Sequence, residues 1–184
     1  MTAQRLAPTV TDLDHVQGDG SALVTLIEYG DFECPSCGKA YPVLKRVKQR
    51  LGDRLRFVFR NFPIAQNHPH AEHAAEAAES VATLGGNQAF WTMHDLLFEN
   101  QKALDDDSLA GYAEEAGVDG RAVLLDLADA RYQRYVRDSF MNGVRSGVNG
   151  TPTLFIDGIR YAGNRDEETL VAALQLVSAR TGGG

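Results

Sequence analysis

The sequence predicts an α/β fold in which a central mixed sheet is flanked by helices and interrupted by a helical insertion. Three observations lead to this prediction. A strand at 23–29, a helical pattern at 34–51 and a strand at 55–59 imply a right-handed parallel unit. Several helical segments then follow between 63 and 149 without a convincing strand. A hairpin and a last helix complete the chain after residue 150.

Length and charge restrict the function. The 184 residues suit one domain, or one domain with a large insertion. A net charge of -7 argues against nucleic acid or an anionic membrane as a partner, because both require clustered positive charge. The chain shows neither a signal-peptide core nor a bilayer-spanning stretch, so we expect a cytoplasmic protein. In a reducing compartment a cysteine pair is more often catalytic, redox-sensing or metal-binding than structural.

The first half of the chain supplies the central strands. The run at 23–29 is apolar on both alternating faces, which is typical of a strand that helices cover on both sides. The run at 55–59 alternates between apolar and other residues and predicts the neighbouring strand. Residues 14–17 fit a short edge strand. The residues before them lack periodicity, so we expect a flexible or loosely docked N-terminal arm over residues 1–13.

The block at 63–149 predicts a helical insertion. A stripe of small residues forms its first helix, which ends at Gly85-Gly86. Further helices are expected at 109–116, 120–130 and 132–146. The last of them should carry Val136, Phe140 and Val144 on its buried face.

The closing part of the chain returns to the sheet. A strand at 153–156 and its partner at 159–162 are joined by Asp157-Gly158, a strong two-residue hairpin signal. A last helix follows. We therefore assign 14–62 and 150–180 to the sheet domain and expect 181–184 to be a disordered tail.

The two cysteines of the chain, Cys34 and Cys37, lie where the strand at 23–29 gives way to a helix. The free N–H groups and the positive dipole end of a helix stabilise an anion, so the first thiol is favoured as thiolate. Cys34 is therefore the expected nucleophile. Cys37 lies three residues on, close enough to attack a mixed disulfide at Cys34, which makes it the expected resolving thiol.

Glu28 is the one acidic residue within the apolar run, six residues before Cys34. An ionised carboxylate inside a sheet is unfavourable, so the pKa of Glu28 should rise, and the group could exchange protons with the thiols. Alternatively, Glu28 is paired with a nearby cation or lies at a hydrated strand end.

Two motifs together carry a family resemblance. Cys34-Pro35-Ser36-Cys37 stands at a strand–helix junction, and Gly150-Thr151-Pro152-Thr153 leads into a hairpin after a helical insertion. Over residues 14–180 the chain resembles the DsbA-like branch of the thioredoxin superfamily. The resemblance implies a thioredoxin-like fold, in which Cys34 is the nucleophile, Cys37 resolves, and Pro35 and Ser36 tune the reduction potential.

The resemblance also assigns a substrate site. It implies a cis peptide bond between Thr151 and Pro152, packed against the cysteines, and a substrate strand that pairs with the backbone at Gly150 and Thr151. Glu28 matches the acidic position that precedes the cysteine motif in the family. Ser36 departs from the histidine of strongly oxidising members and brings no charge. We therefore expect a potential less oxidising than their value of about -120 mV.

The leading hypothesis is a thiol-disulfide oxidoreductase that acts on protein or peptide thiols through Cys34 and Cys37. We expect no cofactor or metal, an electron-transfer partner that the sequence does not identify, and a monomer or weak dimer. Whether the protein oxidises, reduces or isomerises disulfides is left open.

Two other functions compete with this hypothesis. The cysteine pair and the histidines at positions 68, 70 and 73 could bind zinc or share an iron–sulfur cluster between subunits. The aromatic stretch from Phe90 to Phe98 is most simply core, but it could instead line the groove of a peptide-binding, chaperone-like module.

Overall fold

The computed structural model describes residues 4–181 and confirms the predicted thioredoxin-like architecture. Its five-stranded sheet has the order β1-β3-β2-β4-β5. The strands are β1 (His15–Gln17), β2 (Val24–Gly30), β3 (Leu55–Asn61), β4 (Thr153–Ile156) and β5 (Ile159–Arg160). β2 and β3 are parallel, whereas the other neighbouring pairs are antiparallel, so the sheet is mixed.

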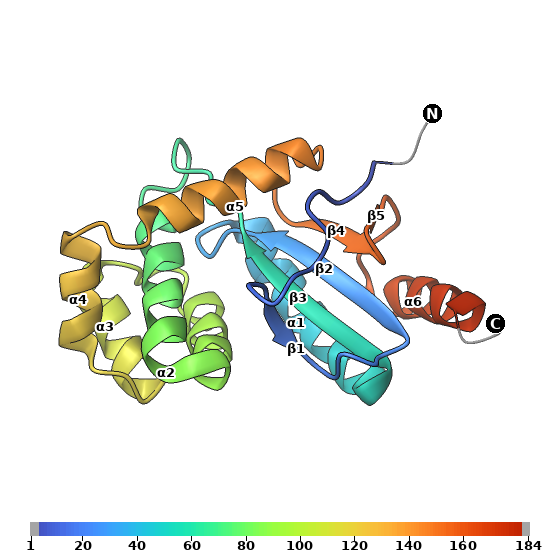
Figure 1. The fold of residues 1–184 in the computed structure, drawn as a ribbon, viewed down its shortest axis with the longest axis horizontal. Coiled ribbons are helices and arrows are strands. Elements are labelled where there is room, and N and C mark those ends of the chain that lie inside the picture. The colour runs from blue at the N-terminus through green and yellow to red at the C-terminus, as the bar shows by residue number, and fades with distance from the viewer. Residues whose placement is uncertain (1–3, 182–184) are drawn as a thin grey trace.

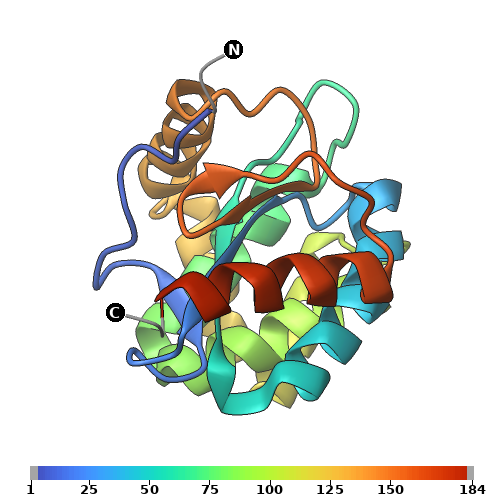
Figure 2. The ribbon, with the colours of Figure 1, turned by 90° about the vertical axis from the view of Figure 1, so that its right-hand side faces the viewer.

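The helices lie on both faces and at one side of the sheet (Figures 1 and 2). They are α1 (Pro35–Leu51), α2 (Ala71–Glu99), α3 (Asp106–Glu115), α4 (Gly120–Ala128), α5 (Gln133–Arg145) and α6 (Glu167–Thr181), with a 3-10 turn at Gly52–Arg54. α1 and α6 cover one face, and α5 crosses the other, while α2, α3 and α4 gather at the side of the sheet (Figure 1). Within residues 4–181 no helix is both long and apolar enough to cross a bilayer.

The alternation of side chains along β2 and β3 divides the core into two parts. Leu26, Phe57 and Phe59 belong to the larger cluster, which includes side chains of α1, α2 and α6. Ile27 and Tyr29 belong to the smaller cluster, where the partly buried Phe140 of α5 packs. Because successive residues of a strand point to opposite faces, β2 is buried on both sides.

Two details of the helical block test the predicted pattern. Gly86 has φ 79° and ψ -173°, so α2 breaks there, as the Gly85-Gly86 pair predicted. In α5, Val136 is buried, but Val144 is 45% exposed, so the prediction of a buried Val144 was wrong. Eight residues of α-helix turn by about 80° beyond two full turns, which carries Val144 away from the face of Val136.

The N-terminal arm is docked where the structure describes it. Leu6 is 8% exposed, and its N–H donates to the oxygen of Gly158 at 2.8 Å. Arg5 forms an isolated bridge with Ile159, so the arm adds backbone pairing at the edge strand β5. Of the two states expected for the arm at 1–13, these contacts correspond to a docked one. Residues 1–3 and 182–184 of the expected arm and tail lie outside the described residues, and α6 includes Thr181.

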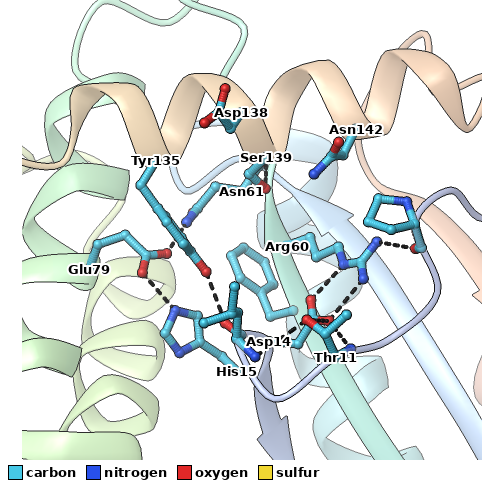
Figure 3. A pocket seen from close by; sticks show the side chains of 13 residues that line it. Thr11, Asp14, His15, Arg60, Asn61, Glu79, Tyr135, Asp138, Ser139 and Asn142 are labelled. Carbon is cyan, nitrogen blue, oxygen red and sulfur yellow. Dashed lines mark hydrogen bonds and ion pairs between the residues drawn. The ribbon is translucent and has the colours of Figure 1, made fainter.

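Arg60 ties this arm to the sheet (Figure 3). Its guanidinium donates to the two carboxylate oxygens of Asp14 at 2.6 and 2.9 Å. It also donates to the backbone oxygens of Pro8 and Thr9 and to the hydroxyl of Tyr29. All five N–H donors of this buried arginine therefore have partners.

A cavity of about 290 Å³ lies beside this ion pair, lined by residues of the arm, β1, β3, α2 and α5 (Figure 3). Glu79 of α2 accepts a hydrogen bond from the Asn61 amide at 2.6 Å and shares one with His15 at 2.8 Å. Ser139 of α5 donates to the backbone oxygen of Asn61 at 2.9 Å. The polar side chains around the cavity thus connect α2 and α5 to the sheet.

Removing the Asp14 carboxylate should destabilise the protein strongly, because it leaves the buried Arg60 charge without its counter-ion. We expect Asp14→Ala to lower the free energy of unfolding by about 3–5 kcal/mol in urea titrations. The matched control is Asp138→Ala, whose exposed pair with Arg134 at 3.9 Å should be worth at most about 0.5 kcal/mol. Equal effects of the two substitutions would contradict this account.

Candidate functional site

The cysteine motif occupies the N-terminal end of α1. Cys34 precedes the helix with an extended backbone, φ -68° and ψ 121°, and Pro35 stands in the first turn, where its missing N–H is not needed. Both cysteines are free thiols. The exposed fraction is 7% for Cys34 and 0% for Cys37, while Pro35 and Ser36 are exposed. Cys34 is therefore the more accessible of the two sulfurs.

The two thiols differ in acidity. Hydrogen bonding from the Cys37 side chain lowers the pKa of Cys34 to about 5, against the effect of burial. The backbone N–H groups of Cys37 and Ser36 act in the same direction. Burial raises the pKa of Cys37, and its hydrogen bond to Cys34 and the nearby Glu28 add to this rise. At neutral pH the site therefore holds one thiolate and one thiol.

The loop before β4 lies against Cys34. The Thr151–Pro152 peptide bond is cis, and the Cys34 Sγ lies 3.6 Å from the backbone oxygen of Thr151, to which it donates only while protonated. Thr153 donates from its hydroxyl to the oxygen of Gly150 at 2.7 Å. Pro152 is buried, whereas Gly150 and Thr151 are half-buried. The structure thus brings the predicted substrate-binding residues next to the predicted nucleophile.

Glu28 lies on β2, between Phe59 of β3 and Leu154 of β4. It is 2% exposed, and its Oε1 has no hydrogen-bond partner among the described residues. Burial raises the pKa of Glu28 to about 8, although Lys48 and Arg165 act in the opposite direction. Within residues 4–181 it forms no ion pair, so the structure supports a buried protonated carboxyl rather than a paired or hydrated one.

Asp31 is a site residue that the sequence did not reveal. Its buried carboxylate accepts hydrogen bonds from the N–H groups of Glu33 at 2.9 Å and Ile64 at 2.8 Å. It also bonds the Nδ1 of His68 at 2.7 Å. The backbone oxygen of Asp31 accepts from the N–H of Cys34 at 3.1 Å. An aspartate just after a strand is a sequence signal for the local hydrogen bond to Glu33. Nothing in the sequence indicates its distant partners, Ile64 and His68.

Gln101, between α2 and α3, is a second residue without a sequence signal. Its amide Nε2 donates to the backbone oxygen of Phe32 at 2.8 Å and to that of Cys34 at 2.9 Å. A Cβ at Gly38 would overlap the Gln101 side chain, which explains the glycine directly after the motif. The helical insertion therefore holds the cysteine turn from outside the sheet.

The structure separates the histidines that the metal hypothesis groups together. His68 bonds Asp31, whereas the Nδ1 of His73 bonds Asp106 at 2.7 Å. The backbone N–H of His70 donates to the carboxylate of Glu33. Across residues 4–181 no three side chains of His, Cys, Asp or Glu are placed to hold a metal ion.

The aromatic side chains that could line a peptide groove are core residues. Phe90, Trp91 and Phe98 are 0%, 5% and 6% exposed. Trp91 packs against Phe57 of the sheet, with ring centroids 5.6 Å apart. The surface of the insertion therefore does not offer these rings to a ligand.

Curated relatives are similar in sequence to nearly the whole chain but are much longer. "Na(+)/H(+) antiporter NhaA 1" of Salinispora arenicola is 42% identical over 178 residues, which are 96% of this chain and 26% of that protein. "Na(+)/H(+) antiporter NhaA 1" of Mycolicibacterium vanbaalenii is 38% identical over 172 residues, which are 92% of this chain and 27% of that protein. The chain thus spans about a quarter of the length of the curated relatives it matches.

Solved structures and a family model agree with the observed fold. Oxidised BdbD from Bacillus subtilis has a TM-score of 0.84 at 20% identity, covering 96% of this chain and 97% of that one. Alpha-DsbA1 from Wolbachia pipientis has a TM-score of 0.81 at 15% identity, covering 95% of each chain. MdbA, a thiol-disulfide oxidoreductase from Corynebacterium diphtheriae, has a TM-score of 0.71 at 20% identity, covering 95% of each chain. A family model described as Thioredoxin matches residues 10–175, so the chain belongs to the thioredoxin family and has the fold of its DsbA-like branch.

Proposed function

We propose that the chain is a thiol-disulfide oxidoreductase that exchanges disulfides with protein or peptide thiols. One observation carries the proposal: Cys34, which is 7% exposed and has a lowered pKa, lies beside the fully buried Cys37, whose pKa is raised, next to the Thr151–Pro152 loop. The DsbA-like fold supports the same activity. We assign no ion transport to the chain, because that name belongs to relatives of which it spans about a quarter.

The reaction needs both thiols in turn. In the reducing direction the Cys34 thiolate attacks one sulfur of a substrate disulfide, whose other sulfur leaves and takes up a proton. Cys37 then loses its proton and attacks the Cys34 sulfur of the mixed disulfide. The substrate leaves with two electrons, and the Cys34–Cys37 disulfide remains. The reverse sequence passes a disulfide to the substrate, and the potentials of the partners decide the direction.

Glu28 is the proposed proton acceptor for Cys37. Cys37 must lose its proton to resolve the mixed disulfide, yet burial raises its pKa, so it needs a base nearby. The pKa of Glu28 is about 8, which permits both proton uptake and proton release near neutral pH. In this proposal the Glu28 carboxyl first releases its own proton to solvent, and the carboxylate so formed then accepts the proton of Cys37.

The backbone around Thr151 is the proposed substrate platform. An extended peptide that pairs with Gly150 and Thr151 would place its sulfur beside Cys34, because the Thr151 oxygen already contacts that thiol. The exposed Pro35 and Ser36 would lie beside the substrate and tune the thiolate. The cytoplasmic location, the unidentified electron partner and the monomeric or weakly dimeric state stay predictions.

Serine variants separate the two cysteine roles. Cys34→Ser should abolish exchange with a disulfide-bonded peptide, because no accessible nucleophile remains. Cys37→Ser should still react but should accumulate a mixed disulfide, which mass spectrometry detects as a peptide adduct removed by reductant. Turnover that persists in Cys34→Ser would reject the proposal.

The pH dependence of alkylation reports the Cys34 thiolate. The iodoacetamide reaction of the reduced protein should be half-maximal near pH 5, and Cys37 should not react below pH 9. Because the folded pKa of Cys34 is lowered, the thiolate stabilises the reduced fold fully above the unfolded pKa of about 8.5. This contribution should fade as pH falls towards 5. A single alkylation midpoint near pH 8.5 would contradict the site as described.

Glu28→Gln tests the buried carboxyl. The folded pKa of Glu28 is raised to about 8, so its burial disfavours the fold increasingly between pH 4.5 and 8. We expect Glu28→Gln to raise the free energy of unfolding by at least about 1 kcal/mol at pH 8 and by little at pH 4. The same variant should slow release of the substrate from the mixed disulfide. It should leave the pH midpoint of Cys34 alkylation nearly unchanged. A pH-independent change in stability would argue against a titrating Glu28.

A further inference from the structure

We infer that His68 is a positioning residue that favours the Cys34 thiolate with a positive charge from the loop between β3 and α2. This inference rests on the proposed function and deepens it. The cysteine motif itself supplies no positive charge, since Pro35 and Ser36 are uncharged.

The geometry joins His68 to the cysteine turn through one buried carboxylate. Asp31 Oδ2 bonds the His68 Nδ1 at 2.7 Å, and Asp31 Oδ1 accepts from the N–H of Glu33 at 2.9 Å. The next residue, Cys34, donates its N–H to the oxygen of Asp31. The His68 N–H donates to the oxygen of Ile64 at 3.0 Å, and the Ile64 N–H donates to Asp31. Both sides of this contact are therefore held by backbone hydrogen bonds.

The charges facing His68 favour its protonated form. They belong to Asp31, Glu33 and Cys34, all of which are on the turn between β2 and α1. Burial lowers the pKa of His68, but the Asp31 hydrogen bond and these negative charges outweigh burial and raise it. The side chain is 15% exposed, so solvent only partly screens these charges.

The effect must be reciprocal. Because the Cys34 thiolate raises the pKa of His68, protonated His68 lowers the pKa of Cys34 by the same number of pKa units. When Cys34 forms a disulfide, the negative charge disappears and His68 binds its proton less tightly. Proton release from His68 therefore accompanies oxidation. The reduced form is favoured, and the protein becomes a stronger oxidant, as pH falls through the His68 pKa.

Alkylation of a His68 variant measures this effect directly. In His68→Gln the pH midpoint of Cys34 alkylation should rise, so that the thiolate fraction at pH 5 falls by about threefold or more. His73→Gln is the matched control, because His73 also bonds a carboxylate at 2.7 Å, but its partner is Asp106 of α3. The control should leave the midpoint unchanged.

Two readouts distinguish charge from mere loop support. The alkylation rate at pH 9, where Cys34 is fully ionised in both proteins, should be the same in His68→Gln and the native protein, because loss of the charge alone leaves the access of the reagent unchanged. In NMR titrations the His68 pKa should be higher in the reduced protein than in the disulfide form. The difference should equal the rise in the Cys34 alkylation midpoint that His68→Gln causes. A folded His68→Gln protein with an unchanged alkylation midpoint would overturn the inference. It would leave the proposed function intact, because that function is tested separately, by disulfide exchange in the native protein and the loss of exchange in Cys34→Ser.

Discussion

The central requirement of this structure is that one sulfur anion be stabilised while it stays accessible. Burial alone would raise the pKa of Cys34, as it does for Cys37. The fold meets the requirement by directing hydrogen-bond donors at Cys34 from the first turn of α1 and from the Cys37 side chain. The difference in burial between the two thiols, 7% against 0% exposed, then assigns them different protonation states.

Four segments distant in sequence hold this arrangement. The turn after β2 contains the cysteines, and the loop before β4 contains the Thr151–Pro152 bond. The loop after β3 supplies His68 to Asp31, and the connection after α2 supplies Gln101 to the carbonyl of Cys34. The insertion is therefore part of the site, because it fixes the backbone on which the reactive sulfur stands.

The opposite face of the sheet depends on a second buried charge. Arg60 projects from β3 and satisfies all its donors with Asp14, Tyr29 and the backbone of the arm. A buried arginine tolerates few alternative arrangements, since each lost partner leaves an unpaired donor or charge. It therefore anchors the arm and β1 against the sheet, near the end of β2 that leads into the cysteine turn.

Features that depend on local patterns could be predicted from the sequence. Alternating or apolar runs predicted β2, β3 and β4, Asp157-Gly158 predicted the hairpin, and the glycine pair at 85–86 predicted the break in α2. The cysteine motif likewise identified the place of the site. The exposure of Val144, the docking contacts of the arm, and the hydrogen bonds of Asp31 and Gln101 became known only from the folded structure. These features join residues tens of positions apart, and neither periodicity nor turn chemistry records which distant side chain will lie within hydrogen-bond reach.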